Sequence, residues 1–151
     1  MAVLPEQRMS IITLGVADRT ASTQFYSDVL GFTPFMRDEI TMFDMGGMVL
    51  GLWERNKLHD DIGLMGNTCP PGASPNFALA YNARSEAEVD EIFGRLVAQG
   101  VKVAVEPHKA AWGGYSGYFT DPDGYAWEVA FNPYWPINAD GSLELPAGED
   151  V

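Results

Sequence analysis

The sequence contains few cysteines, histidines and basic residues. Its 151 residues include one cysteine, Cys69, so an internal disulfide is excluded and a reducing compartment suits the chain. Nine lysines and arginines stand against 21 aspartates and glutamates, which gives a net charge of −12. This charge argues against nucleic acid and anionic membranes as partners, because both would repel an acidic surface. Neutral or cationic ligands are favoured instead.

Long apolar runs are also missing. No stretch approaches the length of a membrane span, and residues 1–10 do not combine a basic region with an apolar run as a signal peptide does. We therefore expect a cytoplasmic protein. Apolar residues make up 46% of the chain and aromatic residues 12%, which is typical of a globular fold rather than a disordered chain.

The same order of predicted elements occurs twice. Each half has a strand of alternating apolar residues, then a helix, then three more strand-like segments. Matching features lie about 65 to 69 residues apart, and a near-constant offset is typical of an internal repeat. The predicted elements are a strand over 10–16, a helix over 20–30 and strands near 32–37, 41–45 and 48–53, then a strand over 76–81, a helix and strands near 102–106, 114–120 and 125–131.

Local signals predict the ends of both helices. Asp18 is expected to cap the first helix, which Gly31 ends. Ser85 and Glu88 have the spacing of a capping box for the second helix, and Gly100 ends it. The predicted inner face of this second helix consists of Val89, Ile92, Phe93, Leu96 and Val97.

Two segments lie outside the repeat. The first is a polar, proline-containing connection, which predicts either a linker or a binding lid. The second is a C-terminal tail rich in helix breakers, whose Tyr134 and Trp135 predict docking on the body or on a partner chain. We expect one domain over residues 8–133, made of a module at about 8–53, a connection at 54–75 and a module at about 76–133, followed by a tail at 134–151.

One carboxylate stands inside an apolar strand. The sequence Asp121-Pro-Asp-Gly124 predicts a tight turn, after which Glu128 alternates with Trp127 and its other apolar neighbours. Glu128 shares its face of the strand with Ala126 and Ala130. A face with one acid between two small residues is more typical of a cavity floor than of a solvated surface.

These features resemble a known family. The paired βαβββ pattern, the first-helix sequence from Asp18 through Phe25-Tyr26 to Gly31-Phe32, and the turn before Glu128 resemble the vicinal oxygen chelate superfamily, the glyoxalase, bleomycin-resistance and extradiol-dioxygenase group. The resemblance covers roughly residues 8–133. It implies an α+β fold in which two tandem βαβββ modules form an eight-stranded, mixed, open cup, and we expect a homodimer.

The ligand positions of the family's metal site can be compared with the residues of this sequence. Enzymes of this family hold a divalent metal on inward-facing side chains, and Glu128 matches the last ligand. The other matching positions are Ile11, Gly51 and Asn76, which offer an aliphatic group, no side chain and a weak amide oxygen. A tightly held catalytic ion needs three or more ligands of the His, Asp, Glu or Cys type. No metal cofactor is therefore predicted, and whether the chain is an enzyme stays open.

The remaining polar and aromatic residues of the predicted cup face are candidates for binding a ligand. In fosfomycin-resistance relatives a matching serine and tyrosine lie against the ligand, so the resemblance suggests this role for Ser116 and Tyr118. Trp53 and Trp112 fit ordinary core or dimer packing equally well. The direction of Phe43 depends on a hairpin register that the pattern does not fix. The predicted ligand-binding residues are Glu128, Tyr118, Ser116, Asn76, Trp53, Trp112, Tyr115 and Thr13.

Three functions follow from these predictions. The leading one is a metal-independent, bleomycin-resistance-type protein that binds a small aromatic or cationic molecule. The alternative is a divalent-metal-dependent lyase or dioxygenase with shifted ligands, using Glu128, Asn76, His108 and water. The third is an accessory domain that binds a protein partner. Glu128 itself has a structural alternative, a hydrogen bond to Asn76 or Tyr118, and His59 is expected in a solvated helix turn.

Overall fold

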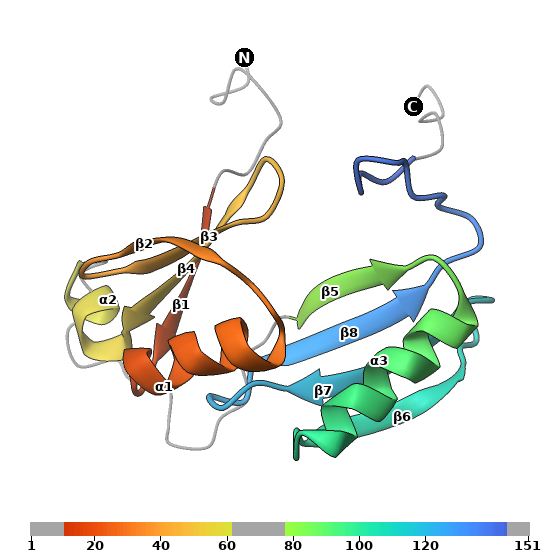
Figure 1. Cartoon of the computed structure of the whole chain (residues 1–151), viewed down its shortest axis with the longest axis horizontal. Coiled ribbons are helices and arrows are strands. Elements are labelled where there is room, and N and C mark those ends of the chain that lie inside the picture. The colour runs from red at the N-terminus through yellow and green to blue at the C-terminus, as the bar shows by residue number, and fades with distance from the viewer. Residues whose placement is uncertain (1–10, 62–77, 145–151) are drawn as a thin grey trace. The chain divides into compact units, whose positions relative to one another are not determined.

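The chain divides into two compact units, each built around a four-stranded mixed sheet. The computed structural model describes residues 11–61 and 78–144 (Figure 1). The units are Met1–Pro70 and Pro71–Val151, and the division falls within the connection predicted at 54–75. Both units have the βαβββ order, so the predicted α+β fold of two tandem modules is confirmed.

The first unit holds its four strands in the order β1-β4-β3-β2. Strands β1 and β4 are parallel, and the other pairs are antiparallel. Part of the predicted connection is helical, because α2 follows β4 directly. The elements are β1 (Ile11–Val16), α1 (Arg19–Gln24), the π-helix η1 (Phe25–Val29), β2 (Pro34–Arg37), β3 (Thr41–Asp44), β4 (Val49–Glu54) and α2 (Arg55–Asp61).

The first helix begins and ends as its sequence predicts. The Asp18 carboxylate accepts a hydrogen bond from the Ala21 backbone N–H at 3.0 Å, which satisfies a donor left free by the first turn. From Phe25 the helix continues as a π-helix, and it ends at Gly31, whose φ of 75° favours glycine. The single helix predicted over 20–30 is therefore an α-helix followed by a π-helical turn.

The core of the first unit settles the direction of Phe43. Its ring packs against Tyr26 at 5.9 Å and against Phe32 at 5.9 Å between centroids, and Phe43 is fully buried. Because Tyr26 belongs to η1, Phe43 faces the helical side of the sheet. It does not join the residues predicted on the opposite face.

The second unit repeats the topology, with strand order β5-β8-β7-β6. Strands β5 and β8 are parallel, and the other pairs are antiparallel. One helix lies across the sheet (Figure 1). The elements are β5 (Ala78–Ala83), α3 (Glu86–Ala98), β6 (Val103–Lys109), β7 (Tyr115–Thr120) and β8 (Ala126–Phe131).

Helix α3 has the predicted cap at its start. The Ser85 hydroxyl accepts from the Glu88 N–H at 3.1 Å, while the Glu88 carboxylate accepts from the N–H of Arg84 at 2.6 Å, one residue before the donor of a standard capping box. At the other end, Gly100 adopts a φ of 74°. The expected caps therefore hold, with one hydrogen bond shifted by a residue.

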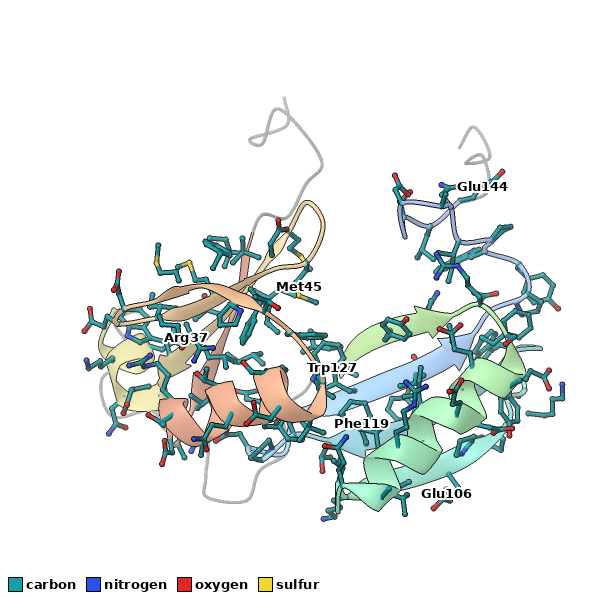
Figure 2. All side chains as sticks on the ribbon, viewed as in Figure 1. Arg37, Met45, Glu106, Phe119, Trp127 and Glu144 are labelled. Carbon is teal, nitrogen blue, oxygen red and sulfur yellow. The ribbon has the colours of Figure 1, made fainter. Side chains whose placement is uncertain are left out.

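The predicted inner face of α3 is correct in its centre and wrong at one edge. Val89, Phe93 and Leu96 are buried against the sheet, whereas Val97 is 57% exposed. Beneath the helix, the rings of Phe119 and Trp127 stack with centroids 6.3 Å apart (Figure 2). None of the helices in the described ranges is long and apolar enough to span a membrane.

The described part of the tail contacts the second unit. Arg84 donates from its guanidinium to the Asn138 carbonyl at 3.2 Å. The Tyr134 ring lies against Gly113, where a Cβ atom would come within 2.6 Å of the tyrosine oxygen. Tyr134 itself is 66% exposed, so it docks by one side only.

Candidate functional site

The candidate site lies on one side of the second sheet, which we call the Glu128 face. Residues directly opposite each other on neighbouring strands share a face. The register places Tyr118 and Ala80 beside Glu128, and it places Ser116 and Asn82 beside Ala130 in the next row. The face comprises Ala78, Ala80, Asn82, Ser116, Tyr118, Thr120, Ala126, Glu128 and Ala130.

Tyr118 and Glu128 form the polar centre of this face. The two residues stand directly opposite each other on β7 and β8, with the phenol placed to donate toward the carboxylate. Burial raises the pKa of Tyr118 above its ordinary value, and the negative charge and hydrogen bond of Glu128 raise it further. The structural hydrogen bond expected between Glu128 and Tyr118 fits this register and stays a prediction, and the two carboxylate oxygens give Glu128 acceptor capacity beyond it.

Ser116 and Trp112 lie toward one end of the Glu128 face. Ser116 is buried, with 3% of its surface exposed. The Trp112 ring lies directly against Gly114, in the space that a Cβ atom there would occupy. Gly114 precedes Ser116 by two residues, so strand alternation places this ring on the same side of the sheet. Trp112 is 46% exposed, which leaves part of its ring accessible.

Tyr115 lies on the other side of the sheet. Its hydroxyl donates to Asp90 of α3 at 2.7 Å, and this hydrogen bond is the main reason that the pKa of Tyr115 is raised. Lys109 covers the ring, 5.7 Å from its centroid. The sheet therefore separates Tyr115 from Glu128, so these two predicted ligand-binding residues do not share a face.

Thr13 and Trp53 belong to the first unit. The β1–β4 register pairs Thr13 with Gly51 and Gly15 with Trp53, so both candidates share one face of that sheet. Arg55 and Leu58 of α2 lie against Gly15 on this face. The indole N–H of Trp53 is buried and has no hydrogen-bond partner in the described part of the unit.

The described residues do not fit the family's metal site. A side chain at Gly51 would meet Thr13 Oγ1 at 3.2 Å and Ile40 at 3.5 Å, so the space beside it is already filled. Ile11 carries no ligand atom, and Asn76 lies outside the described residues. Within 11–61 and 78–144, no three His, Cys, Asp or Glu side chains come together as a metal site would require.

Two polar residues on this side of the sheet are absent from the predicted ligand-binding residues. Asn82 was missed because β5 runs over Ala78–Ala83, two residues beyond the strand predicted at 76–81. Extending the alternation of Ala78 and Ala80 would have found it. His108 was named only for the alternative metal site, and it lies on this side because β6 continues to Lys109, three residues beyond the predicted end. His59 falls within α2, so the expected helix turn is present.

Comparisons with known proteins agree with this architecture. The family model described as the Glyoxalase/Bleomycin resistance protein/Dioxygenase superfamily matches residues 8–129. A solved structure described as a glyoxalase-related enzyme from Fulvimarina pelagi is 40% identical, covers 94% of this chain and 100% of its own, and has a TM-score of 0.82. A lactoylglutathione lyase from Agrobacterium tumefaciens is 27% identical, with coverage of 85% and 96% and a TM-score of 0.67.

A search of curated proteins found no match to this chain. The family match nevertheless spans most of the sequence, and the two βαβββ modules have the expected topology. The chain therefore belongs to the glyoxalase/bleomycin resistance protein/dioxygenase superfamily.

Proposed function

We propose that this chain binds a small aromatic or cationic molecule on the Glu128 face, without a catalytic metal. The observation that carries the proposal is the register that places Tyr118 directly beside Glu128 on a surface of small residues. Ala78 and Ala80 are exposed and leave part of this face uncovered, and the carboxylate supplies a charged acceptor. Apolar surface with a few placed polar groups is the usual composition of a small-molecule site.

The charge of the protein favours a cationic ligand over an anionic one. A net charge of −12 raises the local concentration of cations around the molecule. Tyr118 stands beside Glu128, whose two carboxylate oxygens leave room for a further donor on the ligand. An aromatic group on the ligand would pack over Tyr118 and beside Trp112.

A binding screen tests this proposal. Isothermal titration and thermal-shift assays with aromatic amines, matched neutral aromatics and aromatic carboxylates should give the strongest binding for the amines. Glu128→Gln should abolish that preference, whereas Glu91→Gln, which removes the same charge from the exposed surface of α3, should preserve it. Hits restricted to divalent metals combined with thiol conjugates would contradict the proposal.

A divalent-metal enzyme is the second candidate, and the relatives favour it. The structure that is 40% identical is described as a glyoxalase-related enzyme, and another relative is described as a lactoylglutathione lyase. Shifted ligands would have to include Glu128, Asn76 and His108. Elemental analysis of protein purified without chelators decides between the candidates: near-stoichiometric Fe, Mn, Ni or Zn that disappears in Glu128→Gln would favour the enzyme.

We include a homodimer and a cytoplasmic location in the proposal. Phe35 and Met36 on the edge strand β2 are 57% and 39% exposed, which supports a contact surface between copies. Light scattering after size-exclusion chromatography would measure the mass in solution. The cytoplasmic location is supported by the single cysteine and is checked by cell fractionation.

A further inference from the structure

We propose that His108 belongs to the ligand-binding face and accepts a hydrogen bond, through Nε2, from a second donor on the bound molecule. This inference rests on the proposed function and extends it, because it defines the class of ligand. The ligand would be an elongated aromatic cation whose charged end meets Glu128 and whose far end carries a hydroxyl or N–H group.

A β-bulge directs His108 toward this face. Val105 pairs with Tyr118 and His108 pairs with Ser116, so three steps along β6 correspond to two steps along β7. Without the extra residue, Pro107 would stand opposite Ser116, and His108 would point to the side covered by α3. Bulges of this kind re-aim side chains and are common beside functional sites.

The neighbouring Lys109 independently fixes the side on which His108 lies. Lys109 forms an ion pair with Glu86 of α3 and covers the ring of Tyr115, so it lies on the helical side of the sheet. Successive residues of a strand point to opposite faces. His108 therefore points to the side that carries Ser116 and Glu128.

Gly117 makes the bulge sterically possible. A Cβ atom at this position would come within 2.7 Å of the Val105 carbonyl oxygen and 2.9 Å of the Pro107 nitrogen. Both atoms belong to the backbone of the bulged strand, which therefore lies in the space a side chain would need. A glycine opposite the bulge and a proline within it, which needs no ladder partner for an N–H, together favour this local geometry.

The ring of His108 is held in one orientation. Its Nδ1 lies 3.0 Å from the Glu106 carbonyl oxygen. A carbonyl oxygen only accepts, so Nδ1 must carry the proton, and Nε2 of the neutral ring is then an acceptor. The side chain is exposed, so Nε2 is available to a ligand.

The positions of His108 and Glu128 define the length of the ligand. His108 is on β6 and Glu128 is on β8, two strands apart and one row along the sheet. Strand spacing and rise place their Cα atoms roughly 12 Å apart. One compact group cannot contact both acceptors, whereas an elongated ligand lying over Tyr118 and Ser116 can.

Tyramine and 2-phenylethylamine test the inference as a matched pair, because they differ only by the phenolic hydroxyl. In NMR titrations of the full chain, we expect tyramine to bind about fivefold more tightly, the scale of one hydrogen bond. His108→Phe should remove this preference, so that tyramine and 2-phenylethylamine bind with equal affinity. His108→Gln, whose amide oxygen can accept, should restore part of the preference, and Glu128→Gln should weaken both amines equally.

The outcomes separate the two proposals. A hydroxyl preference that survives in His108→Phe, or no preference in the wild type, overturns the role of His108 alone. Failure of both amines to bind the wild type overturns the proposed function together with this inference. A ligand-independent check is the ¹⁵N spectrum at pH 9, where imidazole is neutral. His108 should show a protonated Nδ1 and an unprotonated Nε2, and the reverse tautomer would contradict the inference.

Discussion

Tyr118 and Glu128 stand directly opposite each other on neighbouring antiparallel strands, and each changes the chemistry of the other. Besides burial, the carboxylate favours the neutral phenol and so raises the pKa of Tyr118, and the phenol is a donor beside the carboxylate. The carboxylate of Glu128 can accept further hydrogen bonds, and its other neighbours on this face are small residues. At the scale of single residues, this pair explains why an acid is tolerated within an otherwise apolar strand.

Glu128→Gln separates the role of the charge from that of the hydrogen bond. The glutamine keeps the volume and a carbonyl oxygen that can accept from Tyr118, so we expect the melting temperature to stay the same or rise. Binding of a cationic ligand should weaken by about 1.5–3 kcal/mol, the scale of a charge-assisted hydrogen bond. Titration calorimetry and thermal melts measure both effects.

Tyr118→Phe is the matched control for this prediction. It removes the hydrogen bond to Glu128 and leaves the negative charge in place. If Glu128 were only structural, Tyr118→Phe would lower the melting temperature, and ligand affinity would barely change in Glu128→Gln. ¹³C-labelled tyrosine provides a further readout, since Glu128→Gln should lower the pKa of Tyr118 without removing the contribution of burial.

At the scale of elements, the β6–β7 pair decides which residues face the ligand side. Two register shifts along β6 break the simple alternation of its side chains. Gly117 of β7 lies opposite the bulge in β6 and beneath Phe93 of α3. The backbone of the bulge and the Phe93 ring both occupy the space that a side chain at this position would need. The geometry of this pair therefore depends on a glycine that no local turn requires.

Gly117→Ala is expected to destabilise the second unit. The added methyl would meet Phe93 Cζ at 2.7 Å and the Val105 carbonyl oxygen at 2.7 Å, and overpacking of this kind costs about 1–3 kcal/mol. Urea denaturation followed by tryptophan fluorescence measures the change.

Gly94→Ala is the matched control for the added methyl group. Gly94 lies in the middle of α3, and a Cβ atom there meets nothing within 4 Å. Replacing a helical glycine by alanine should therefore stabilise the unit by up to about 1 kcal/mol. Equal effects of the two substitutions would show that the β6 backbone can move away from residue 117.

At the scale of the whole molecule, two modules of one topology have different polar chemistry. In the first module the space beside Gly51 is filled by Thr13 and Ile40, while the second module carries Glu128 and Tyr118 on one face of its sheet. Three tyrosines with raised pKa values, Tyr81, Tyr115 and Tyr118, all lie in the second unit. Burial is the main cause for Tyr81 and Tyr118, and the hydrogen bond to Asp90 is the main cause for Tyr115.

These tyrosines predict that the second unit loses stability at alkaline pH. The ordinary tyrosine pKa is 10.0, and a raised pKa means that the folded state keeps its proton after the unfolded chain has lost it. Their stabilising contribution is therefore complete below pH 10 and is lost as the pH rises through the folded-state values. Urea titrations from pH 8 to 11.5 measure it, and Tyr118→Phe should flatten the dependence. An unchanged slope in that variant would contradict the role of Tyr118.

The elements of this fold were largely predictable from the sequence because their signals are local. Asp18 and Ser85 each accept from a backbone N–H three residues ahead, and Gly31 and Gly100 end their helices by a positive φ. Alternation placed Ser116, Tyr118 and Glu128 on one face, and the observed register agrees. The repeat and the turn before Glu128 were enough to identify the family.

The tertiary structure alone decided which neighbours these residues meet. Phe43 turned to the helical side, Tyr115 paired with Asp90, and His108 reached the Glu128 side through a bulge. Each outcome depends on the register between strands that are distant in sequence, and one inserted residue reverses the direction of every side chain that follows. A single strand carries its own alternation in its sequence, but the partner strand fixes which face each residue occupies.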